Sequence, residues 1–544
     1  YPWAGGLILA TVAALLCAGS GAYILAVSGT RPQALHLVPG VLLLVLHNRY
    51  THHLATSLAL LVAVLGVCLY LWMRGHGPWW RLLGFLILSG IVYYVAAGAF
   101  LIYAVLCGIF ELLRKQHCVG VLCLVCAFAL PYVAGSYVLP VRLSDAYGRL
   151  LPFHREGDPS WAALAACLYA FLPLAALSVA FGRWLTKGAR SASVDGAAAG
   201  AGAFRQRHRH IRSVVTSVLV LIAGAVAVCL SLDRDAKALL QMEYCIRTGA
   251  WTGVLEAARR VPADRYGLNV SWDVNRALYH TGRLRDEMFS YPQDGLSLRP
   301  PDPVAAPLDL SQTACMEYSD VLFDLGRVNE SERAAYMALE YLGERPAILQ
   351  RLALLSVARG EAEAARILLG ALSQDLILAG WARRYLARLG KDPSLSADEE
   401  IGRLRSVMVT EDKVGTPPFE DLLLDLLRSN RHNRMAFEYL MAHYLLSRDL
   451  EGVARNIGRL DDFGHRDIPK HYEEAIVLHM AGTDSEVDLR GRSIRWETLS
   501  RFTEFCKMRD RHSGDRRRAW DALAKDYGDT YFFYYTFGSS GGTE

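Results

Sequence analysis

The chain has 544 residues, of which 58 are Lys or Arg and 54 are Asp or Glu, so its formal net charge is only +4. This balance gives no electrostatic reason to expect nucleic-acid binding, and none is predicted. Hydrophobic residues make up 52% of the chain, whose length suggests about three or four domain-sized units of roughly 150 residues each.

The even charge balance hides two unlike halves. Residues before Ser213 include 16 Lys and Arg against 5 Asp and Glu, a net charge of +11, whereas the remainder has 42 against 49, a net charge of −7. Membrane proteins keep an excess of cations on the cytoplasmic side of the bilayer. A basic first half and an acidic second half therefore indicate a membrane domain followed by a soluble domain.

Apolar runs dominate the first half, and a run of roughly 20 apolar residues is long enough to span a bilayer. The six expected spans are Gly5–Val27, Leu54–Met73, Leu82–Leu106, Cys118–Leu139, Trp161–Gly182 and Ser213–Ser231. A further run, His36–Leu46, is too short and predicts a broken or re-entrant helix. No basic segment or cleavage motif accompanies the first run, so we expect a retained helix, not a signal peptide.

The segment 183–212 is the most basic part of the chain. Its seven cations are Arg183, Lys187, Arg190, Arg205, Arg207, Arg209 and Arg212. We expect it to be a cytoplasmic loop between a multi-pass domain, 1–182, and the last transmembrane helix, 213–231.

Counting spans back from this loop predicts the side of each connection. Residues 140–160 should lie outside and residues 107–117 inside, whereas residues 74–81 should lie outside although they include two arginines. Everything after residue 231 should be extracytoplasmic. The predicted location is the bacterial cytoplasmic (inner) membrane, with the second half on its outer face.

Glycine turns divide the second half at a regular interval. Gly249, Gly282, Gly326 and Gly360 follow helix-like runs, and their spacings are 33, 44 and 34 residues. A period of 33–34 residues is typical of tetratricopeptide-type helix–turn–helix repeats. The excess in the middle interval corresponds to the Pro-rich insertion 291–307.

The predicted fold class is therefore all-α, with a multi-span transmembrane domain followed by a divergent tetratricopeptide-like α-solenoid. We expect the repeats over 233–390, a further helical-repeat-like region over 391–537, and a disordered tail over 538–544.

Within the last region, Asn433–Leu446 is predicted to be an amphipathic helix, and another helix should begin near Pro469. His432, Arg434, Glu438 and His443 are expected on the polar side of the first of these helices. The last regular element should be Asp515–Tyr527. The aromatic run Tyr531–Phe537 after it is interpreted as closing the core, against the alternative of a docking strand or a membrane-facing patch.

Several motifs resemble an uncharacterised family of bacterial multi-pass membrane proteins with a C-terminal tetratricopeptide-like helical half. The most specific are NRMAFEYLMAHYLLSRDL (433–450), DIPKHYEEAI (467–476) and GDTYFFYY (528–535), and two weaker ones are RDEMFSYPQ (285–293) and LLPF (150–153). The family is a domain of unknown function. The resemblance thus implies an architecture, but no activity and no catalytic residues.

Two clusters could hold a metal or a cofactor. His47, His52 and His53 lie beside the short apolar run and could bind a metal or relay protons. Their spacing fits no zinc pattern and no acidic ligand is near, so an interfacial turn is the favoured interpretation. Cys118, Cys123 and Cys126 have the C-x4-C-x2-C spacing of the cysteine ligands in a plant-type iron–sulfur site. No fourth cysteine lies near enough to complete such a site. No metal and no cofactor are predicted.

The second half holds three of the eleven cysteines, an odd number that does not indicate a disulfide framework. A single bridge between Cys245 and Cys315 is left open, because this half is expected outside the cytoplasm.

The expected outer loop contains the weak catalytic candidates Asp145, His154, Arg155 and Glu156. A carboxylate and a histidine could act as general bases, and an arginine could hold a lipid-linked phosphate. The first acidic residue of the chain is Glu111, so the first outer loop cannot supply the acidic pair of large membrane glycosyltransferases. A solvated polar loop is the favoured interpretation.

The prediction is a membrane-anchored helical-repeat scaffold that binds a protein or a cell-envelope partner on the extracytoplasmic side. The alternative is a membrane enzyme of envelope-glycan assembly, for glycosyl transfer or polymer ligation, that uses the 140–160 loop. A third hypothesis, a transporter that uses the broken helix 36–46, is weakened because no acidic residue is expected within the spans.

Overall fold

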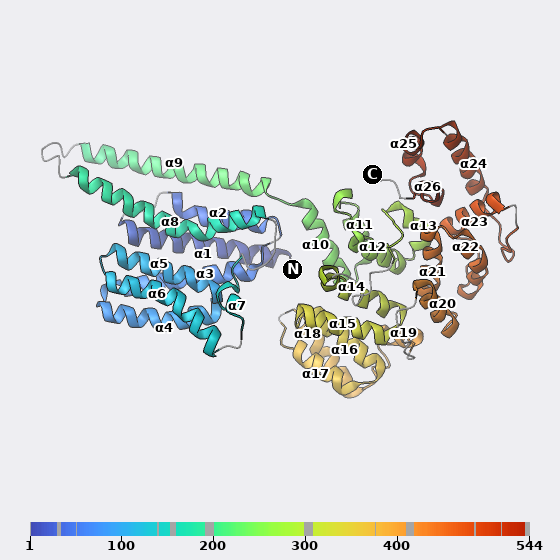
Figure 1. Cartoon of the computed structure of the whole chain (residues 1–544), viewed down its shortest axis with the longest axis horizontal. Coiled ribbons are helices and arrows are strands. Elements are labelled where there is room, and N and C mark those ends of the chain that lie inside the picture. The colour runs from blue at the N-terminus through green and yellow to red at the C-terminus, as the bar shows by residue number, and fades with distance from the viewer. Residues whose placement is uncertain are drawn as a thin grey trace. The chain divides into compact units, whose positions relative to one another are not determined.

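The computed structural model describes most of the chain (Figure 1). The described residues are 2–29, 34–50, 52–138, 141–152, 159–190, 201–298, 308–375, 377–409, 418–483, 486–512 and 514–538. Within these ranges all regular elements are helices and there is no strand. The chain divides into two compact units, Tyr1–Lys237 and Ala238–Glu544, which we describe separately.

The first unit is a bundle of apolar helices, the membrane unit. Its α-helices are α1 (Pro2–Ser28), α2 (Val38–His47), α3 (Leu54–Trp72), α4 (Pro78–Ala96), α5 (Phe100–Leu113), α6 (His117–Val133), α7 (Leu143–Gly148), α8 (Pro159–Arg190) and α9 (Ala201–Leu230). Five stretches are long and apolar enough to cross a membrane: Gly5–Ser28, Leu54–Gly75, Pro78–Leu113, His117–Val138 and Ala162–Val179. Val214–Leu230 passes the same test only together with Arg234–Arg247, from which it is bent by 62°.

The predicted short helix is present as an apolar segment, Ala34–His47, that packs against the first span. Its 3₁₀ turn approaches α1, where the Cys17 thiol lies 3.7 Å from the Leu37 carbonyl oxygen. Beyond its other end, the Asn48 side-chain amide donates a hydrogen bond to the Val228 carbonyl of α9 at 2.5 Å. This segment therefore joins the first and last helices of the membrane unit.

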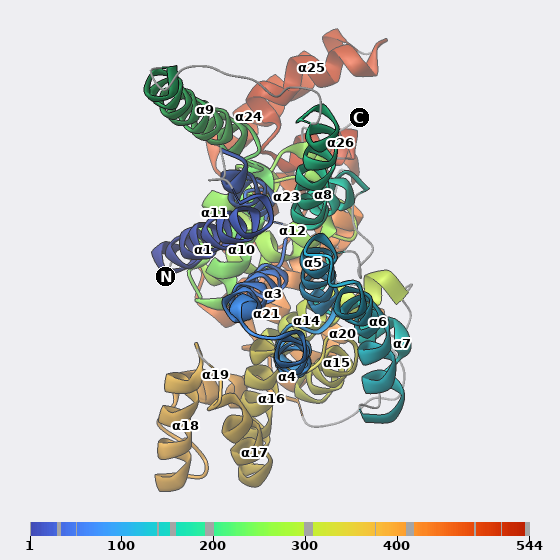
Figure 2. The same cartoon turned by 90° about the vertical axis from the view of Figure 1, so that its left-hand side faces the viewer.

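The apolar run expected as one span over Leu82–Leu106 is two helices, which corrects that prediction. The 3₁₀ turn Ala97–Ala99 separates α4 from α5, and Figure 2 shows the two helices as separate rods. The Phe85 and Tyr103 rings stack at 5.4 Å, and Arg81 contacts Glu111, thirty residues along the chain, at 3.0 Å. Because a straight helix would hold Arg81 and Glu111 about 45 Å apart, α5 must fold back along α4.

The α4–α5 hairpin changes which connections share an end of the bundle. The Arg114 guanidinium donates a hydrogen bond to the Arg74 carbonyl at 3.0 Å, so the connections 74–81 and 107–117 lie at the same end. The sequence had predicted opposite sides for them. Composition misses the turn because Ala97, Gly98 and Ala99 are themselves small and uncharged.

The other end of the bundle holds the α4–α5 turn, residues 141–152 and the residues just before α3. The Gly98 N–H of the hairpin turn donates to the Arg149 carbonyl at 2.9 Å, which brings residues 141–152 to that end. Since α3 ends beside Arg74, its first residue, Leu54, also lies at the opposite end. Asn48, which precedes α3, accepts a hydrogen bond from the Asp233 N–H at 3.3 Å, so the chain leaves α9 there as well.

The basic segment 183–212 is less of a loop than predicted. Helix α8 extends to Arg190 and α9 begins at Ala201, so most of the segment is helical, and residues 191–200 lie outside the described ranges. Arg and Lys are good helix formers, so a basic composition marks the side of the membrane without interrupting a helix.

We call the second unit the repeat unit after its regularly spaced glycine turns. It is built from shorter helices. They are α10 (Arg234–Arg247), α11 (Trp251–Ala258), α12 (Leu268–His280), α13 (Leu284–Glu287), α14 (Leu308–Leu325), α15 (Val328–Leu342), α16 (Pro346–Arg359), α17 (Ala362–Leu372), α18 (Ala379–Lys391), α19 (Glu399–Val407), α20 (Phe419–Ser429), α21 (Arg434–Ser447), α22 (Leu450–Asn456), α23 (Lys470–Thr483), α24 (Trp496–Arg511), α25 (Arg516–Tyr527) and α26 (Tyr531–Phe537). Of the predicted insertion 291–307, residues 291–298 are described and residues 299–307 lie outside the described ranges.

The four predicted glycine turns are confirmed. Gly249, Gly282, Gly326 and Gly360 lie between consecutive helices with φ of 68°, 71°, 88° and 85°. Residues with a Cβ rarely adopt this left-handed conformation, so glycine suits each turn. Gly326 also lacks room for a side chain, because a Cβ there would collide with the Val407 carbonyl.

The aromatic run near the C-terminus forms helix α26 and no docking strand. Tyr531, Phe532 and Phe533 are each 0% exposed. The interpretation that this run closes the core is confirmed. The expectation that Asp515–Tyr527 is the last regular element is wrong, since one more helix follows it; residues 539–544 of the predicted tail lie outside the described ranges.

Candidate functional site

The predicted catalytic loop is only partly described. Asp145 lies in the first turn of α7, half-buried, and its carbonyl accepts a hydrogen bond from the Arg149 N–H at 2.9 Å. His154, Arg155 and Glu156 lie outside the described residues. The enzyme hypothesis for the 140–160 loop therefore stays a prediction.

The histidines near the short helix pair with hydroxyl groups of α3. His47 Nε2 lies 2.7 Å from Ser57 Oγ, and His52 Nε2 lies 3.0 Å from Thr56 Oγ1. The His47 and His52 rings meet edge to face at 5.1 Å. Among the described residues no three His, Cys, Asp or Glu side chains are grouped to hold a metal, His53 included. These contacts are those of a polar turn that fastens α2 to α3.

No disulfide bond is formed by any of the cysteines, all of which lie in the described ranges. Cys245 and Cys315 are both buried, and the bridge that the sequence left open between them is not formed. Cys118, Cys123 and Cys126 lie along α6, with the middle one buried and the first exposed.

A buried ion pair ties α3, α4 and α5 together in the membrane unit. Arg81 Nη1 lies 3.0 Å from Glu111 Oε1, and the two side chains are 4% and 0% exposed. The Tyr70 hydroxyl donates to the same carboxylate oxygen at 2.7 Å. Glu111 belongs to an apolar stretch long enough to span, so the expectation that the spans hold no acidic residue is wrong. An isolated charge there is costly, and its partner makes burial tolerable.

A larger network of buried charge lies in the repeat unit, between α12, α14 and α16. The Arg276 guanidinium contacts Asp320 at 3.1 Å and Asp324 at 2.9 Å. His280 Nε2 lies 3.0 Å from Asp324, and Arg351 contacts Asp320 at 2.6 Å. Burial works to raise the pKa of the Asp324 carboxyl, but Arg276 and His280 hold it well below its usual value.

Aromatic and acidic side chains surround this network. The Trp251 ring stacks on His280 at 4.1 Å, and the Arg276 guanidinium lies 5.4 Å from the Trp251 ring centre. Burial raises the pKa of Asp273 to about 8, against the opposing effect of Arg276, and raises the pKa of Glu317 to about 7. Both carboxyls therefore titrate near neutral pH, a behaviour found at functional sites and also in structural networks of buried charge.

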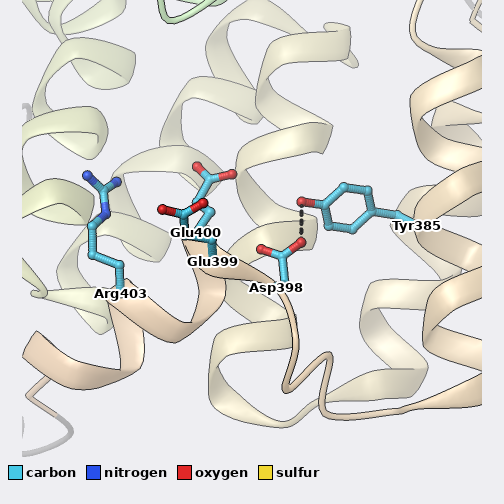
Figure 3. Close-up of a pocket in the computed structure, with 5 residues that line it drawn as sticks. All are labelled: Tyr385, Asp398, Glu399, Glu400 and Arg403. Atoms are coloured by element: carbon cyan, nitrogen blue, oxygen red, sulfur yellow. Dashed lines mark hydrogen bonds between the residues drawn. The ribbon is translucent and has the colours of Figure 1, made fainter.

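The network opens to solvent at Arg403, the residue shared by two hollows. One hollow of about 430 Å³ is lined by Tyr385, Asp398, Glu399, Glu400 and Arg403 (Figure 3). The other, of about 370 Å³, is lined by Tyr279, His280, Thr281, Gly282, Arg403 and Arg434. We call these the acidic hollow and the basic hollow.

Most residues that line the acidic hollow belong to helix α19 or to its N-cap, Asp398. Asp398 caps the helix by accepting a hydrogen bond from the Ile401 N–H at 3.1 Å. Its carboxylate also accepts from the Tyr385 hydroxyl at 3.0 Å, the contact drawn in Figure 3, and lies 2.9 Å from Arg388. Asp398 is thus neutralised by neighbours, whereas Glu399 and Glu400 are exposed.

Residues of α21 complete the basic hollow and correct another expectation. Glu438 was expected on the polar side of its helix, but it is buried, and its carboxylate accepts from Arg434 Nε at 2.7 Å. The Arg434 side chain remains 46% exposed beside the hollow.

The sequence analysis missed Arg276, Asp324, Arg403 and Arg434 as parts of one site. A usable signal existed in α12, LNVSWDVNRALYH, where Asp273 and Arg276 stand three residues apart among apolar neighbours. Charges on the apolar side of an amphipathic helix must be paired when they are buried. Their partners, 44 and 48 residues away, were not visible from the helix itself.

Comparison with known proteins gives a family and no activity. No curated protein and no solved structure shows a significant match to the chain. One family model, described as a family of unknown function (DUF6057), matches residues 1–538. The chain therefore belongs to the DUF6057 family.

Proposed function

We propose that this protein is a membrane-anchored scaffold, whose repeat unit is a tetratricopeptide-like solenoid that binds a partner protein on the outer face of the bacterial inner membrane. The carrying observation is that the α4–α5 hairpin brings the basic connections 74–81 and 107–117 to the same end of the membrane unit.

Cations gather at one end of the bundle. Arg74, Arg81, Arg114 and Lys115 belong to connections that the α4–α5 hairpin brings together. With 74–81 and 107–117 at one end, the two arginines that conflicted with a count of spans now agree with the cytoplasmic retention of cations. The chain leaves α9 at the opposite end, near Asn48 and Asp233. This arrangement supports an extracytoplasmic repeat unit.

The helix pairs of the second unit support the solenoid interpretation. α14 packs on α15 and α16 packs on α17, with Gly326 and Gly360 in the turns. Stacked helix pairs of this kind expose an extended surface on which a partner can lie. The combination of an anchor and stacked helix pairs supports the scaffold proposal.

Thiol labelling at defined positions tests the sidedness. In the chain with its native cysteines replaced by Ala, single thiols are introduced by Gly295→Cys and Gly75→Cys. Both glycines are exposed, and neither position has another heavy atom within 4 Å of an added Cβ. We expect an impermeant maleimide to label Gly295→Cys in cells with a permeabilised outer membrane, and Gly75→Cys only after the inner membrane is opened.

The cysteine-free chain without a new thiol is the control for background labelling. Labelling of Gly75→Cys in intact cells together with protection of Gly295→Cys would reverse the orientation. The repeat unit would then be a cytoplasmic adaptor. Labelling of both positions from the same side would contradict the assignment of the bundle's two ends.

A further inference from the structure

The two hollows beside Arg403 differ in charge, although one side chain borders both. The basic hollow presents the guanidinium groups of Arg403 and Arg434, and the acidic hollow presents the carboxylates of Glu399 and Glu400. We propose that together they form one groove for an extended peptide segment of the partner protein that carries an acidic and a basic side chain. This proposal rests on the scaffold function, because it takes the partner to be a protein.

Arg403 is placed to receive a carboxylate from outside. Its side chain is 52% exposed, and its contact with the Asp324 carboxylate is 3.9 Å long, beyond hydrogen-bond distance. Asp324 already receives hydrogen bonds from Arg276 and His280, so it does not need Arg403. A planar guanidinium with uncommitted donors is suited to two parallel hydrogen bonds with an incoming carboxylate.

Arg434 adds a second guanidinium on the far side of the basic hollow. Only its Nε is committed, to Glu438 at 2.7 Å. Its Nη2 lies 3.9 Å from the position that a Cβ on residue 282 would occupy. Residue 282 is a glycine, and its φ of +71° is a conformation that other residues rarely adopt. The turn that ends α12 thus leaves this guanidinium uncovered, with the Tyr279 ring beside it.

The acidic hollow is suited to a cation. Within the described part of the chain, neither Glu399 nor Glu400 has an ion-pair partner within 4.0 Å, whereas the neighbouring Asp398 is held by Arg388. Burial raises the pKa of Glu400, and the more distant Arg351 and Arg403 guanidinium groups oppose that effect only in part. Figure 3 shows the Glu399, Glu400 and Arg403 side chains projecting from α19, with Tyr385 on the other side of Asp398. A Lys or Arg of a ligand could pair with these carboxylates. The Tyr385 ring itself is already covered, because Trp381 stacks on it at 4.2 Å and the Arg388 guanidinium lies 5.3 Å from its centre.

The pairing of hollows favours a peptide over an anionic polymer. A polyanionic glycan that placed one charge at Arg403 would bring its next charges towards Glu399 and Glu400, where like charges repel. A peptide segment with both signs of charge satisfies both hollows. Tyr279, which lines the basic hollow, adds an aromatic side chain of the kind that is enriched in binding sites for proteins.

Peptides of defined charge test the groove with the purified full chain in detergent. Three short synthetic peptides of equal length share a Gly/Ser backbone sequence. The first carries both Glu and Lys, the second carries only Glu, and the third carries only Lys. Polygalacturonate serves as the anionic polymer. At about 0.15 M salt, where distant charges are screened, we expect the mixed peptide to bind at least about tenfold more tightly than any other probe.

Variants assign the binding to the two hollows. Arg403→Ala should weaken the mixed peptide about tenfold, while Arg366→Ala, which removes an exposed arginine of α17, should leave it unchanged. The double variant Glu399→Gln, Glu400→Gln should weaken the mixed and Lys-only peptides and strengthen the Glu-only peptide. The thermal unfolding of each variant verifies that the fold is retained.

Several results would overturn the groove. These are equal binding of the mixed and Glu-only peptides, tighter binding of polygalacturonate, no binding of any probe, and equal effects of Arg403→Ala and Arg366→Ala. Because purified protein meets the peptides directly, none of these results depends on the orientation in the membrane. The scaffold proposal is judged separately by the labelling of Gly295→Cys.

Discussion

The two units of this protein bury charge in different ways. In the membrane unit Arg81 and Glu111 form a compact pair with the Tyr70 hydroxyl, among apolar helices. In the repeat unit Arg276 and Asp324 belong to a network that continues through His280 and reaches solvent at Arg403. We call the Arg81–Glu111 pair closed, because both side chains are buried, and the Arg276–Asp324 network open, because it reaches solvent at Arg403.

The difference follows from what surrounds each unit. A bilayer offers no water to a polar group, so a charge in the membrane unit must find its partners within the protein. Arg81 and Glu111 meet each other and Tyr70, although Arg81 Nε and Glu111 Oε2 have no hydrogen-bond partner among the described residues. The Arg81–Glu111 pair fastens α4 to α5 and has no path to a ligand among the hollows described. In the repeat unit, water and ligands can reach the edge of the network, so the same types of side chain can also bind. Buried charge therefore indicates architecture in one unit and recognition in the other.

Removing only one partner of the closed pair, Arg81, should have the largest effect on stability. Arg81→Ala leaves the Glu111 carboxylate without its cation, which should destabilise the membrane unit by about 3–5 kcal/mol. The measurement is thermal unfolding of the full chain in detergent, together with its yield from membranes. Arg74→Ala, at an exposed arginine of the same end, should behave as the parent chain.

Replacing both partners sharpens that test. Arg81→Met with Glu111→Leu removes the charges together, and a well-packed apolar pair is often as stable as a buried ion pair. The double variant should recover most of the lost stability. If it is no better than Arg81→Ala, the pair has a role beyond balancing charge.

The open network should tolerate loss of one partner better than the closed pair. Asp324→Asn deprives Arg276 of one carboxylate but leaves Asp320, so we expect a loss of about 3 kcal/mol or less in the repeat unit. Glu363→Gln, at an exposed ion pair with Arg366, should cost at most about 1 kcal/mol. Unfolding curves of the two variants in detergent compare them. A larger loss for Asp324→Asn than for Arg81→Ala would reverse the comparison between the units.

The open network should also make stability depend on pH. Arg276, Glu317, Asp320 and Glu243 face Asp273, whose pKa is raised to about 8 by burial. Because the folded state holds a proton that the unfolded chain releases above about pH 4, stability should fall as the pH rises from about 4 to about 8. Asp273 should contribute at most about 1.4 kcal/mol per pH unit to this fall, and Glu317, whose pKa is raised to about 7, adds to it at lower pH.

Asp273→Asn isolates this contribution. The substituted amide cannot ionise, so the melting temperature of the repeat unit should fall less between pH 5.5 and pH 8 than in the parent chain. Asp510→Asn, at a side chain that is 65% exposed, is the matched control and should keep the parent slope. An unchanged slope in Asp273→Asn would assign the pH dependence to other groups.

Local sequence was enough for the helices and their turns. Apolar length predicted the spans such as Leu54–Met73, because the bilayer thickness sets a minimum run. The 33-residue spacing predicted the turns at Gly249 and Gly282, because only glycine adopts positive φ without steric cost. Asn433 and Pro469 likewise mark the starts of α21 and α23 through local capping preferences.

Tertiary structure decided where charges meet and where the chain turns back. No residue type in the apolar run predicts that the chain reverses direction at Ala97–Ala99. The composition of the run is compatible both with a single membrane crossing and with a helical hairpin. Arg81 meets Glu111 across 30 residues, and Arg276 meets Asp324 across 48. Local composition determines which segments become helices, but burial of a charge depends on a partner that only packing brings into reach. For that reason the sequence determined the elements of this protein, and the tertiary structure alone determined its candidate site.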